Sequence, residues 1–595
     1  IAFQGETIVE ATWKIDGNKI SFKLGSYNEN ETLIIDPVVR LWGTYYGSRV
    51  NDSGRGCATD INGNVYIAGV TENAYIVNTS IATSGSHQTT YAGGNYEDAF
   101  LVKFNSSGVR QWGTYYGGTS RDYGISCATD SSGNVYLAGT TQSTTGIATT
   151  GAHQSAITGS TQDAFLVKFN SSGVRQWGTY YGGSSNEYGS FCAVDTSGNV
   201  YLVASTYSKT GIASKGAHDT LYGGPSANLF LVKFNSNGVR QWGTYYGEVC
   251  STIGVSCATD ASGNVYLSGS TASTTGIATA GAHQAAFGGN YNGFLVKFNS
   301  SGARQWGTYY GGTGSSSSHS CATDASGNVY LAGDASSTTG IATTGAHDTT
   351  LSGTSDAYLV KFNSSGVRQW GTYYGGPGKE NSLSCATDAS GNVYMVGMTN
   401  STTGIATTGA HQTSIGGTWD AFLVKFNSSG VPQWGTYYGG AGYDYGNSCA
   451  TDASGNVYLA GHTQGGFNGL IPYGSTTGIS TLGSHQTTLN HGATWRYRLY
   501  RTNINTSIVK QDAFLVKFDG CPAVYSQDTI TACDSYTWID GVNYTANDTS
   551  ATDILVTSYG CDSIISLYLT INHSKTLTDT IVACDSYKWI NGVTY

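Results

Sequence analysis

Short runs of alternating apolar and polar residues recur along most of the chain at a nearly fixed interval. The string Trp-Gly-Thr-Tyr-Tyr-Gly occurs seven times, 64 to 70 residues apart. Its copies begin at Trp42, Trp112, Trp177, Trp242, Trp306, Trp370 and Trp434. The strings Gly-Asn-Val-Tyr and Phe/Tyr-Leu-Val-Lys-Phe also occur seven times each. Self-similarity of this length predicts a repeat architecture rather than several unrelated domains.

Each repeat has the pattern of four β-strands. In the second repeat they are expected at residues 126–130, 134–139, 163–169 and 174–181, where Val, Tyr, Phe, Trp and Thr are frequent. Gly and Asn stand in the intervening turns, where tight hairpins need positive φ. No stretch of the chain has the 3.6-residue apolar period that would indicate a helix. Four antiparallel strands in about 65 residues are typical of a propeller blade.

The two ends of the repeat array complement each other. The first Trp-Gly-Thr-Tyr-Tyr-Gly, at Trp42, has no earlier strands of its own blade, and the last repeat ends at Phe518 without this string. The strand at residues 39–46 is therefore expected to complete the seventh blade, which hides both terminal strand edges. The sequence predicts an all-β chain with a seven-bladed β-propeller of four antiparallel strands per blade, flanked by small β modules.

The flanking segments have patterns of their own. Residues 1–38 contain one hairpin pattern and are predicted to be an N-terminal β module that is cut short. The propeller is predicted over residues 39–520. A Cys-Asp-Ser-Tyr segment then recurs after 51 residues. This repeat predicts a β-sandwich-like module at 521–572 and the start of a second one at 573–595.

Composition and charge exclude several partners. Charged residues make up 11% of the chain and the formal net charge is −10, with no basic stretch, so no nucleic-acid partner is expected. No apolar run reaches the roughly 18 residues that a transmembrane helix needs. Since the chain begins at Ile1, we expect a processed fragment that lacks its targeting signal.

The repeated strings together resemble the bacterial SBBP β-propeller repeat. The resemblance rests on Asp-x-x-Gly-Asn-Val-Tyr-Leu-Ala-Gly, Gly-Ala-His-Gln, Asp-Ala-Phe-Leu-Val-Lys-Phe and Trp-Gly-Thr-Tyr-Tyr-Gly-Gly, over residues 39–520. The Cys-Asp-Ser modules resemble the tandem repeats of Bacteroidetes surface adhesins. These resemblances imply an extracellular or cell-surface location reached by type IX secretion. They do not imply a reaction.

The twelve cysteines fall into two classes. Seven occupy one position of each blade and are predicted to be buried small apolar residues: Cys57, Cys127, Cys192, Cys257, Cys321, Cys385 and Cys449. Cys533 and Cys561 flank one terminal module and are a candidate disulfide. Cys584 would pair beyond Tyr595, and the sequence assigns no partner to Cys250 or Cys521.

Repeated polar residues are interpreted as structural. One histidine per blade is expected to pack, and the Asp-x-x-Gly-Asn turns, such as that of Asp130, have too few carboxylates for an EF-hand loop. We therefore predict no metal site and no cofactor, with a structural calcium ion as the alternative. There is no Gly-x-Ser-x-Gly, His-Glu-x-x-His or phosphate-binding loop, so the sequence predicts no catalytic residues and no enzyme activity.

Departures from the repeat are the candidate binding positions. The largest is in the seventh blade, where 51 positions separate Gly461 from Asp512, against 24 between Gly139 and Asp163. Aromatic and arginine side chains, which often anchor interfaces, gather in this insertion. The candidate binding residues are Trp495, Arg496, Tyr497, Arg498, Tyr500 and Arg501. Packing of the insertion on the terminal modules is the alternative.

Three functions are compatible with these features. The first is a cell-surface adhesin or structural protein, whose partners are surface glycans or proteins, or other copies of the chain. The second is a lectin-like propeller that binds carbohydrate through blade-specific loops. The third, a secreted polysaccharide-active enzyme, would need blade-specific paired carboxylates, and the sequence shows no convincing set.

Overall fold

The fold is all-β: the residues that the computed structural model describes form strands, turns and loops, and none of them lies in a helix. These are residues 2–4, 7–9, 11–16, 19–24, 34–35, 40–48, 50–72, 81–159, 161–224, 226–247, 256–407, 409–464, 466–468, 471–473, 478–481, 483–488, 511–520, 524–549, 551–556, 562–575, 578 and 580–595. The chain divides into two compact units, residues 37–522 and residues 1–36 with 523–595. The described part of the chain contains no helix that could cross a membrane.

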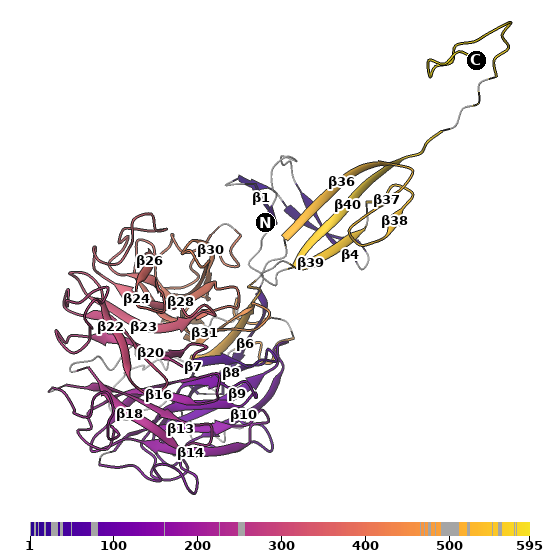
Figure 1. Ribbon diagram of the computed structural model, residues 1–595. Helices are drawn as coiled ribbons and strands as arrows, with labels where there is room; N and C mark the ends of the chain where they lie inside the picture. The colour runs from indigo at the N-terminus through magenta and orange to yellow at the C-terminus, as the bar shows by residue number, and fades with distance from the viewer. Residues whose placement is uncertain are drawn as a thin grey trace. The chain divides into compact units, whose positions relative to one another are not determined.

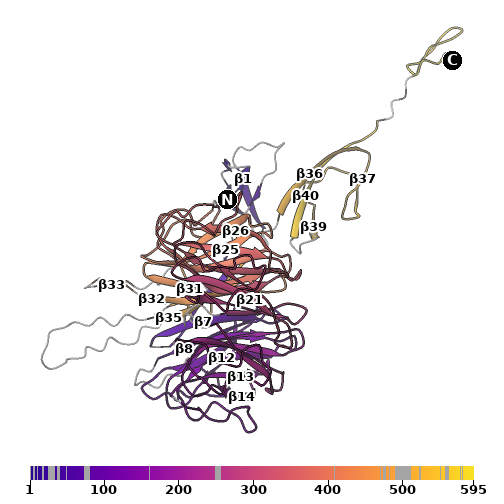
Figure 2. The ribbon, with the colours of Figure 1, turned by 60° about the vertical axis from the view of Figure 1, so that its left-hand side comes forward.

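Residues 37–522 form a ring of seven four-stranded antiparallel sheets (Figures 1 and 2). The innermost strands are β7 (Asp52–Thr59), β11 (Asp122–Thr129), β15 (Glu187–Val194), β19 (Ser256–Thr259), β23 (Ser316–Thr323), β27 (Glu380–Thr387) and β31 (Tyr443–Thr451). The second strands are β8 (Val65–Thr71), β12 (Val135–Thr141), β16 (Val200–Thr206), β20 (Val265–Thr271), β24 (Val329–Ala335), β28 (Val393–Thr399) and β32 (Val457–Gln464).

The third and outer strands complete each blade. The third strands are β9 (Asp98–Phe104), β13 (Asp163–Phe169), β17 (Asn228–Phe234), β21 (Asn292–Phe298), β25 (Asp356–Phe362), β29 (Asp420–Phe426) and β35 (Gln511–Phe518). The outer strands are β10 (Arg110–Tyr116), β14 (Arg175–Tyr181), β18 (Arg240–Tyr246), β22 (Arg304–Tyr310), β26 (Arg368–Tyr374), β30 (Pro432–Tyr438) and β6 (Arg40–Tyr46). Blade seven also carries the hairpin β33 (Gly466–Asn468) and β34 (Ile471–Tyr473).

The predicted ring closure is confirmed. Strand β6 pairs antiparallel with β35, with Tyr46 opposite Ala513 and Trp42 opposite Lys517. In Figure 1 the indigo β6 accordingly lies in the same blade as strands from the other end of the propeller sequence. The seventh blade is therefore built from both ends of the propeller, and β6 pairs with the edge of β35 that would otherwise be exposed.

The hydrophobic core lies between neighbouring blades. One cluster combines Tyr66 and Leu101 of blade one with Leu137, Phe165 and Tyr180 of blade two, all fully or almost fully buried. The middle strands are buried on both faces because each sheet is covered by a blade on either side. This explains why their sequences, such as Asp-Ala-Phe-Leu-Val-Lys-Phe, contain long apolar runs rather than strict alternation.

Hydrogen bonds from threonine link the innermost strands around the ring. Thr59 donates from Oγ1 to the carbonyl of Thr451 at 2.5 Å, and Thr129 donates to the carbonyl of Thr59 at 2.6 Å. Blades four to seven repeat the link. Blade three has Val194 at this position, which has no hydroxyl to donate. Six of the seven junctions therefore share one side-chain to backbone bond.

The innermost strands begin earlier than the sequence indicates. In blade two the prediction places this strand at 126–130, whereas β11 starts at Asp122. The register between β11 and β12 shifts between Gly124 and Ser126. The residues before this irregularity differ from blade to blade, so the repeat pattern does not reveal them as strand.

The second unit contains small sheets. Strands β1 (Ala2–Gln4), β2 (Thr7–Val9) and β5 (Ile34–Ile35) form one sheet, and β3 (Ala11–Asp16) pairs with β4 (Lys19–Leu24). Strands β36 (Val524–Cys533), β40 (Asp562–Asn572) and β39 (Thr552–Val556) form another, beside the hairpin β37 (Tyr536–Thr537) and β38 (Asn543–Tyr544). Trp538 is buried against Leu567, Leu569 and Ile571.

Candidate functional site

Seven buried lysines each form an ion pair within their own blade and a hydrogen bond to the neighbouring blade. In blade two, Lys168 lies 3.2 Å from the carboxylate of Asp130 and its Nζ is 5.0 Å from the ring centroid of Tyr136. Burial alone would raise the pKa of Asp130, but hydrogen bonds from Asn134 and the charge of Lys168 hold this pKa below its ordinary value. The same ion pair recurs in every blade, at 3.2 to 3.9 Å.

The Asp-x-x-Gly-Asn turns are hairpin turns, as predicted. Asp130 accepts hydrogen bonds from the backbone N–H groups of Ser132 and Asn134, both at 3.0 Å. Gly133 has φ of 75°, a conformation that a side chain would strain. The carboxylate is thus used by its own turn and by Lys168, which explains why it is repeated.

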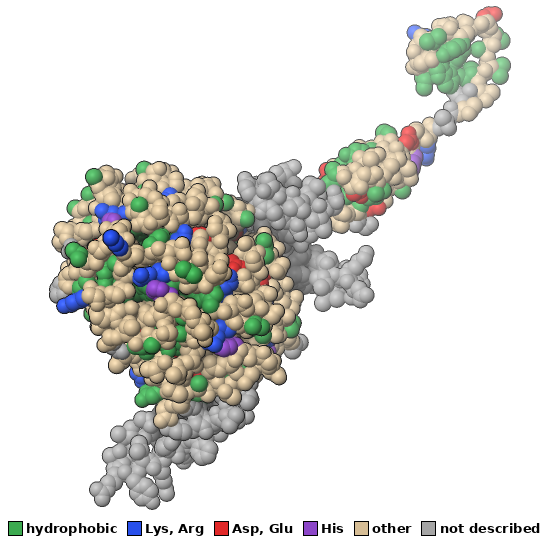
Figure 3. Space-filling view, turned by 60° about the horizontal axis from the view of Figure 1, so that its bottom comes forward, with side chains coloured by type: hydrophobic (Ala, Val, Ile, Leu, Met, Phe, Trp, Pro, Cys, Tyr) green, Lys and Arg blue, Asp and Glu red, His purple; other side chains and the backbone are tan. Residues whose placement is uncertain are grey.

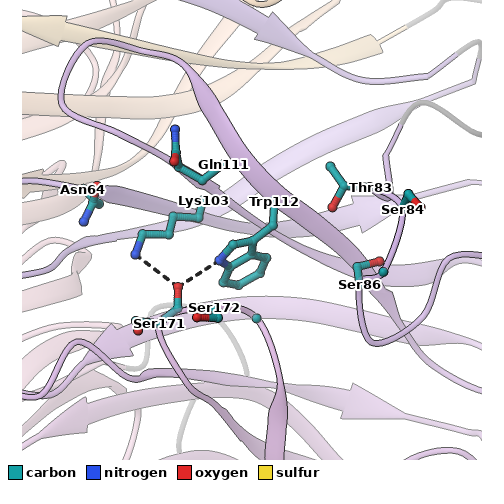
Figure 4. Close-up of a pocket in the computed structure, with 11 residues that line it drawn as sticks. Asn64, Thr83, Ser84, Ser86, Lys103, Gln111, Trp112, Ser171 and Ser172 are labelled. Carbon is teal, nitrogen blue, oxygen red and sulfur yellow. Dashed lines mark hydrogen bonds between the residues drawn. The ribbon is translucent and has the colours of Figure 1, made fainter.

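A pocket of about 400 Å³ lies between blades one and two (Figure 4). Lys103 and the Trp112 indole both donate to the carbonyl of Ser171, at 3.2 and 3.0 Å. An equivalent pocket of about 470 Å³ is lined by Trp242 and Lys233. Since the lysine and tryptophan of both pockets recur in every blade and bond to the backbone of the neighbouring blade, we interpret the pockets as features of blade packing.

The repeated histidines pack on aromatic rings, as predicted. His87 lies 6.0 Å from the ring centroid of Tyr116 and 5.7 Å from that of Phe169. Burial lowers the pKa of His87 to about 4, and nearby Arg175 lowers it further. The seven cysteines that recur once per blade are likewise free and buried.

Residues that differ between blades contact one another on and beside the innermost strands of blades seven, one and two. A separate contact of this kind, between His319 Nε2 and Asp334 Oδ1 at 2.6 Å, lies in blade five. His462 stacks on Tyr445 with ring centroids 4.5 Å apart. The His462 Nδ1 atom lies 2.8 Å from Asn447 Nδ2 and 3.3 Å from Ser53 Oγ. Asn447 also donates to the carbonyl of Gly54 in blade one, at 2.7 Å. The stack therefore spans the junction where the ring closes.

The same cluster continues into blades one and two through charged side chains. Arg121 forms an ion pair with Glu97 at 3.1 Å and lies 5.5 Å from the ring centroid of Tyr96. Arg55 is exposed, yet surrounding protein lowers its pKa. Burial raises the pKa of Tyr123, the charge of Glu97 raises it further, and the charge of Arg55 lowers it. We call the following residues the inner-ring sector: Ser53, Arg55, Tyr96, Glu97, Arg121, Tyr123, Tyr445, Asn447 and His462.

The inner-ring sector has the chemistry of a binding surface. It combines two guanidinium groups, a carboxylate, amide and imidazole groups and three tyrosines within one part of the ring. Arginine and tyrosine are frequent interface anchors because each combines apolar contact area with hydrogen-bond donors. On the face that Figure 3 shows, uncharged side chains dominate and acidic ones are few. Charged residues make up only 11% of the chain, so a cluster of mixed charge is uncommon in it.

The predicted binding residues Trp495, Arg496, Tyr497, Arg498, Tyr500 and Arg501 lie outside the described residues. Cys561 also lies outside them, so its disulfide with Cys533 stays a prediction; Cys533 itself is exposed. Among described residues, no three or more His, Cys, Asp and Glu side chains form a metal-binding group. In the sequence, Tyr445 and the Arg121–Tyr123 segment stand among the departures from the repeat, but no sequence pattern indicates that Arg55 and His462 join them.

Protonation of His462 provides a test of the stack. Burial lowers the pKa of His462 to about 3, and Arg55 lowers it further. As pH falls below about 6.5, the unfolded chain binds a proton that the folded chain does not, so stability is lost toward pH 3. Between pH 7 and 4, wild type should lose about 3 kcal/mol more than His462→Phe in urea unfolding. Equal losses would contradict the buried, neutral imidazole.

Comparison with known proteins identifies the repeat. Residues 41–75, 111–145 and 433–468 match the family model of the SBBP β-propeller repeat. The chain carries SBBP β-propeller repeats. Each matched SBBP segment runs from an outer strand, through the inter-blade loop, to the second strand of the next blade. The segments thus cover β6 to β8, β10 to β12 and β30 to β33.

Apart from the SBBP repeat, the comparisons show only a similarity in fold to solved structures. No curated protein matches the chain significantly. The polysaccharide lyase Uly1 aligns over 78% of this chain and 90% of its own, with 8% identity and a TM-score of 0.39. A protein of unknown function from Dyadobacter fermentans covers 61% of this chain and 94% of its own, with 11% identity and a TM-score of 0.31. These similarities carry no inference about activity.

Proposed function

We propose that the chain is an extracellular, non-catalytic adhesin that uses the propeller as a rigid scaffold and binds cell-surface ligands through the inner-ring sector. One observation carries this proposal: the repeated lysine and aspartate side chains bond within the fold, whereas the blade-specific side chains of blades seven, one and two form one cluster of arginine, tyrosine, histidine and glutamate. A repeat that served a reaction in every blade would leave its polar groups available to substrate.

The groups in the sector favour a polar ligand. Arg121 and Tyr96 form a cation–π contact beside the Glu97 carboxylate, so planar donors, acceptors and ring faces lie close together. Such groups suit the hydroxyls and carboxylates of surface glycans. The resemblance of the terminal modules to adhesin repeats supports the same location and role.

Binding by variants tests the proposed function. Labelled protein is applied to a glycan array and to bacterial and host cells. Arg121→Ala should weaken binding about tenfold, because loss of an interface anchor costs about 1–2 kcal/mol. Lys379, the exposed residue at the equivalent position of blade six, supplies the matched control, and Lys379→Ala should bind as wild type does.

Two results would contradict this proposal. One is equal loss of binding in Arg121→Ala and Lys379→Ala, which would mean that the inner-ring sector is not the contact surface. The other is release of new reducing ends or unsaturated sugars when wild type is incubated with polysaccharides, which would establish an enzyme.

A further inference from the structure

A β-bulge interrupts the innermost strand of several blades at the same position. In blade one, Gly54 lies opposite Gly69 and Gly56 lies opposite Ala68, so Arg55 between them has no residue opposite it. The register shifts at the equivalent place in blades two, five, six and seven. A bulge leaves its extra residue unpaired and re-aims that side chain. Because the innermost strands of a propeller surround its central channel, the bulged residues lie in a ring around that channel.

The bulged residue is different in each of these blades. The five residues are Arg55, Ile125, His319, Leu383 and Asn447. By contrast, the buried cysteine two residues further along the strand is the same in all of them. Arg55 is exposed, and the other four bulged residues are half-buried. The innermost strand therefore keeps its core position constant and varies the position that the bulge turns away from the sheet ladder.

Arg55 is a charged bulged residue without a bonding partner. His319, the other ionisable residue of the set, lies 2.6 Å from Asp334 Oδ1. In the part of the chain that the structure describes, no hydrogen bond or ion pair joins Arg55 to another residue. Burial lowers the pKa of Arg55 by more than the charges of Tyr123 and Glu97 raise it. The guanidinium is thus open to solvent but crowded by protein, where the negative charge of a ligand is attracted more strongly than in water.

Carboxylates of blade one are engaged by groups other than Arg55. Glu97, whose charge acts on Arg55, forms its ion pair with Arg121 at 3.1 Å. Glu72 accepts a hydrogen bond from Asn51 Nδ2 at 2.8 Å. The inner-ring sector therefore holds two guanidinium groups and one carboxylate, and that carboxylate already has a guanidinium partner. A positively charged group remains for a ligand, on a chain whose formal net charge is −10.

His462 supplies a second hydrogen-bond donor near Arg55. The two side chains are close enough for the charge of Arg55 to lower the pKa of His462. The His462 Nδ1 atom accepts from Asn447 Nδ2 at 2.8 Å, so the neutral ring carries its proton on Nε2. Among the described residues, no protein group accepts a hydrogen bond from this Nε2–H. A charged guanidinium and a neutral N–H together favour a ligand with negatively charged oxygen atoms.

We propose that the inner-ring sector selects acidic glycans, and that Arg55 binds the carboxylate or sulfate group of the sugar. The planar guanidinium can donate two parallel hydrogen bonds to such a group. A neutral sugar would leave Arg55 without a partner and would lose this interaction. The inference rests on the proposed adhesin function, to which it adds the class of ligand and the residue that selects it.

Polymers that differ in charge test this selection. Polygalacturonate is compared with its methyl ester, and dextran sulfate with dextran, by biolayer interferometry on the full chain at physiological ionic strength. Wild type should bind the acidic member of at least one pair about tenfold more tightly than the neutral member. Arg55→Gln should lose this preference and keep the wild-type affinity for the neutral polymer. The two pairs also show whether the carboxylate or the sulfate is preferred.

Leu383→Gln is the matched control, because it changes the bulged position of blade six, and it should bind as wild type does. Arg55→Lys keeps the charge but loses the planar fork, so it should retain only part of the preference. Wild-type binding that is equal within each pair, or absent, would overturn the inference, as would a preference that survives Arg55→Gln. The proposed function is decided separately, by the loss of cell binding in Arg121→Ala.

Discussion

Deletion of residues 1–46 is expected to abolish the folded propeller. The deletion removes β6, the outer strand of blade seven, and with it the buried side chains of Trp42, Tyr45 and Tyr46. Tyr46 donates to the carbonyl of Ile81 in blade one at 2.6 Å, so the junction is lost together with the blade. Each buried aromatic side chain contributes about 2–3 kcal/mol, and β35 would be left with an exposed edge.

Thermal unfolding by circular dichroism and size-exclusion chromatography measure this effect. The matched control is deletion of residues 1–36, which lie outside the propeller unit and leave β6 in place. The control should keep the cooperative transition of the propeller, whereas the longer deletion should lose it and aggregate. A longer deletion that melts as the control does would show that ring closure does not stabilise the fold.

Replacement of Lys168 by Met should destabilise the propeller by about 3 kcal/mol. The Lys168 and Asp130 side chains are only 10% and 6% exposed, so the substitution leaves a buried carboxylate without its cation. Lys168 also donates to the carbonyl of Ser236 in blade three, at 3.3 Å, and that bond is lost too. Part of the cost is offset because Asp130 keeps its hydrogen bonds from Asn134.

Two further variants separate charge from packing in this result. Lys379→Met removes an exposed lysine and should change the free energy of unfolding by less than about 0.5 kcal/mol. Lys168→Met/Asp130→Asn removes both charges and should be more stable than Lys168→Met alone. The single variant Asp130→Asn completes the comparison. If the loss of unfolding free energy in the double variant equals the sum of the losses in Lys168→Met and Asp130→Asn, the two charges are not coupled.

Most of the fold follows from the repeat. Seven copies of three strings predict the blade count, the strand order and the closing strand, because each string has one role in each sheet. The lysine of Leu-Val-Lys-Phe and the aspartate of Asp-x-x-Gly-Asn recur in equal number, yet the pattern does not show that they meet. Their contact depends on the register of strands that are not adjacent in the sequence.

The functional positions were less predictable, for two reasons. His462, Ser53 and Arg55 come together only because blade seven closes against blade one, and no local pattern indicates this. Arg121, Glu97 and Tyr96 lie in segments that differ from blade to blade, so the repeat pattern does not show that they contact one another.

The most direct test of the adhesin account is a chain-tracing electron cryomicroscopy structure of the protein bound to its native cell surface. We predict ligand density against the inner-ring sector, in contact with Arg121 or Arg55, and no bound product of a reaction. Contacts spread equally over all seven blades, or density confined to the repeated outer strands, would contradict the account.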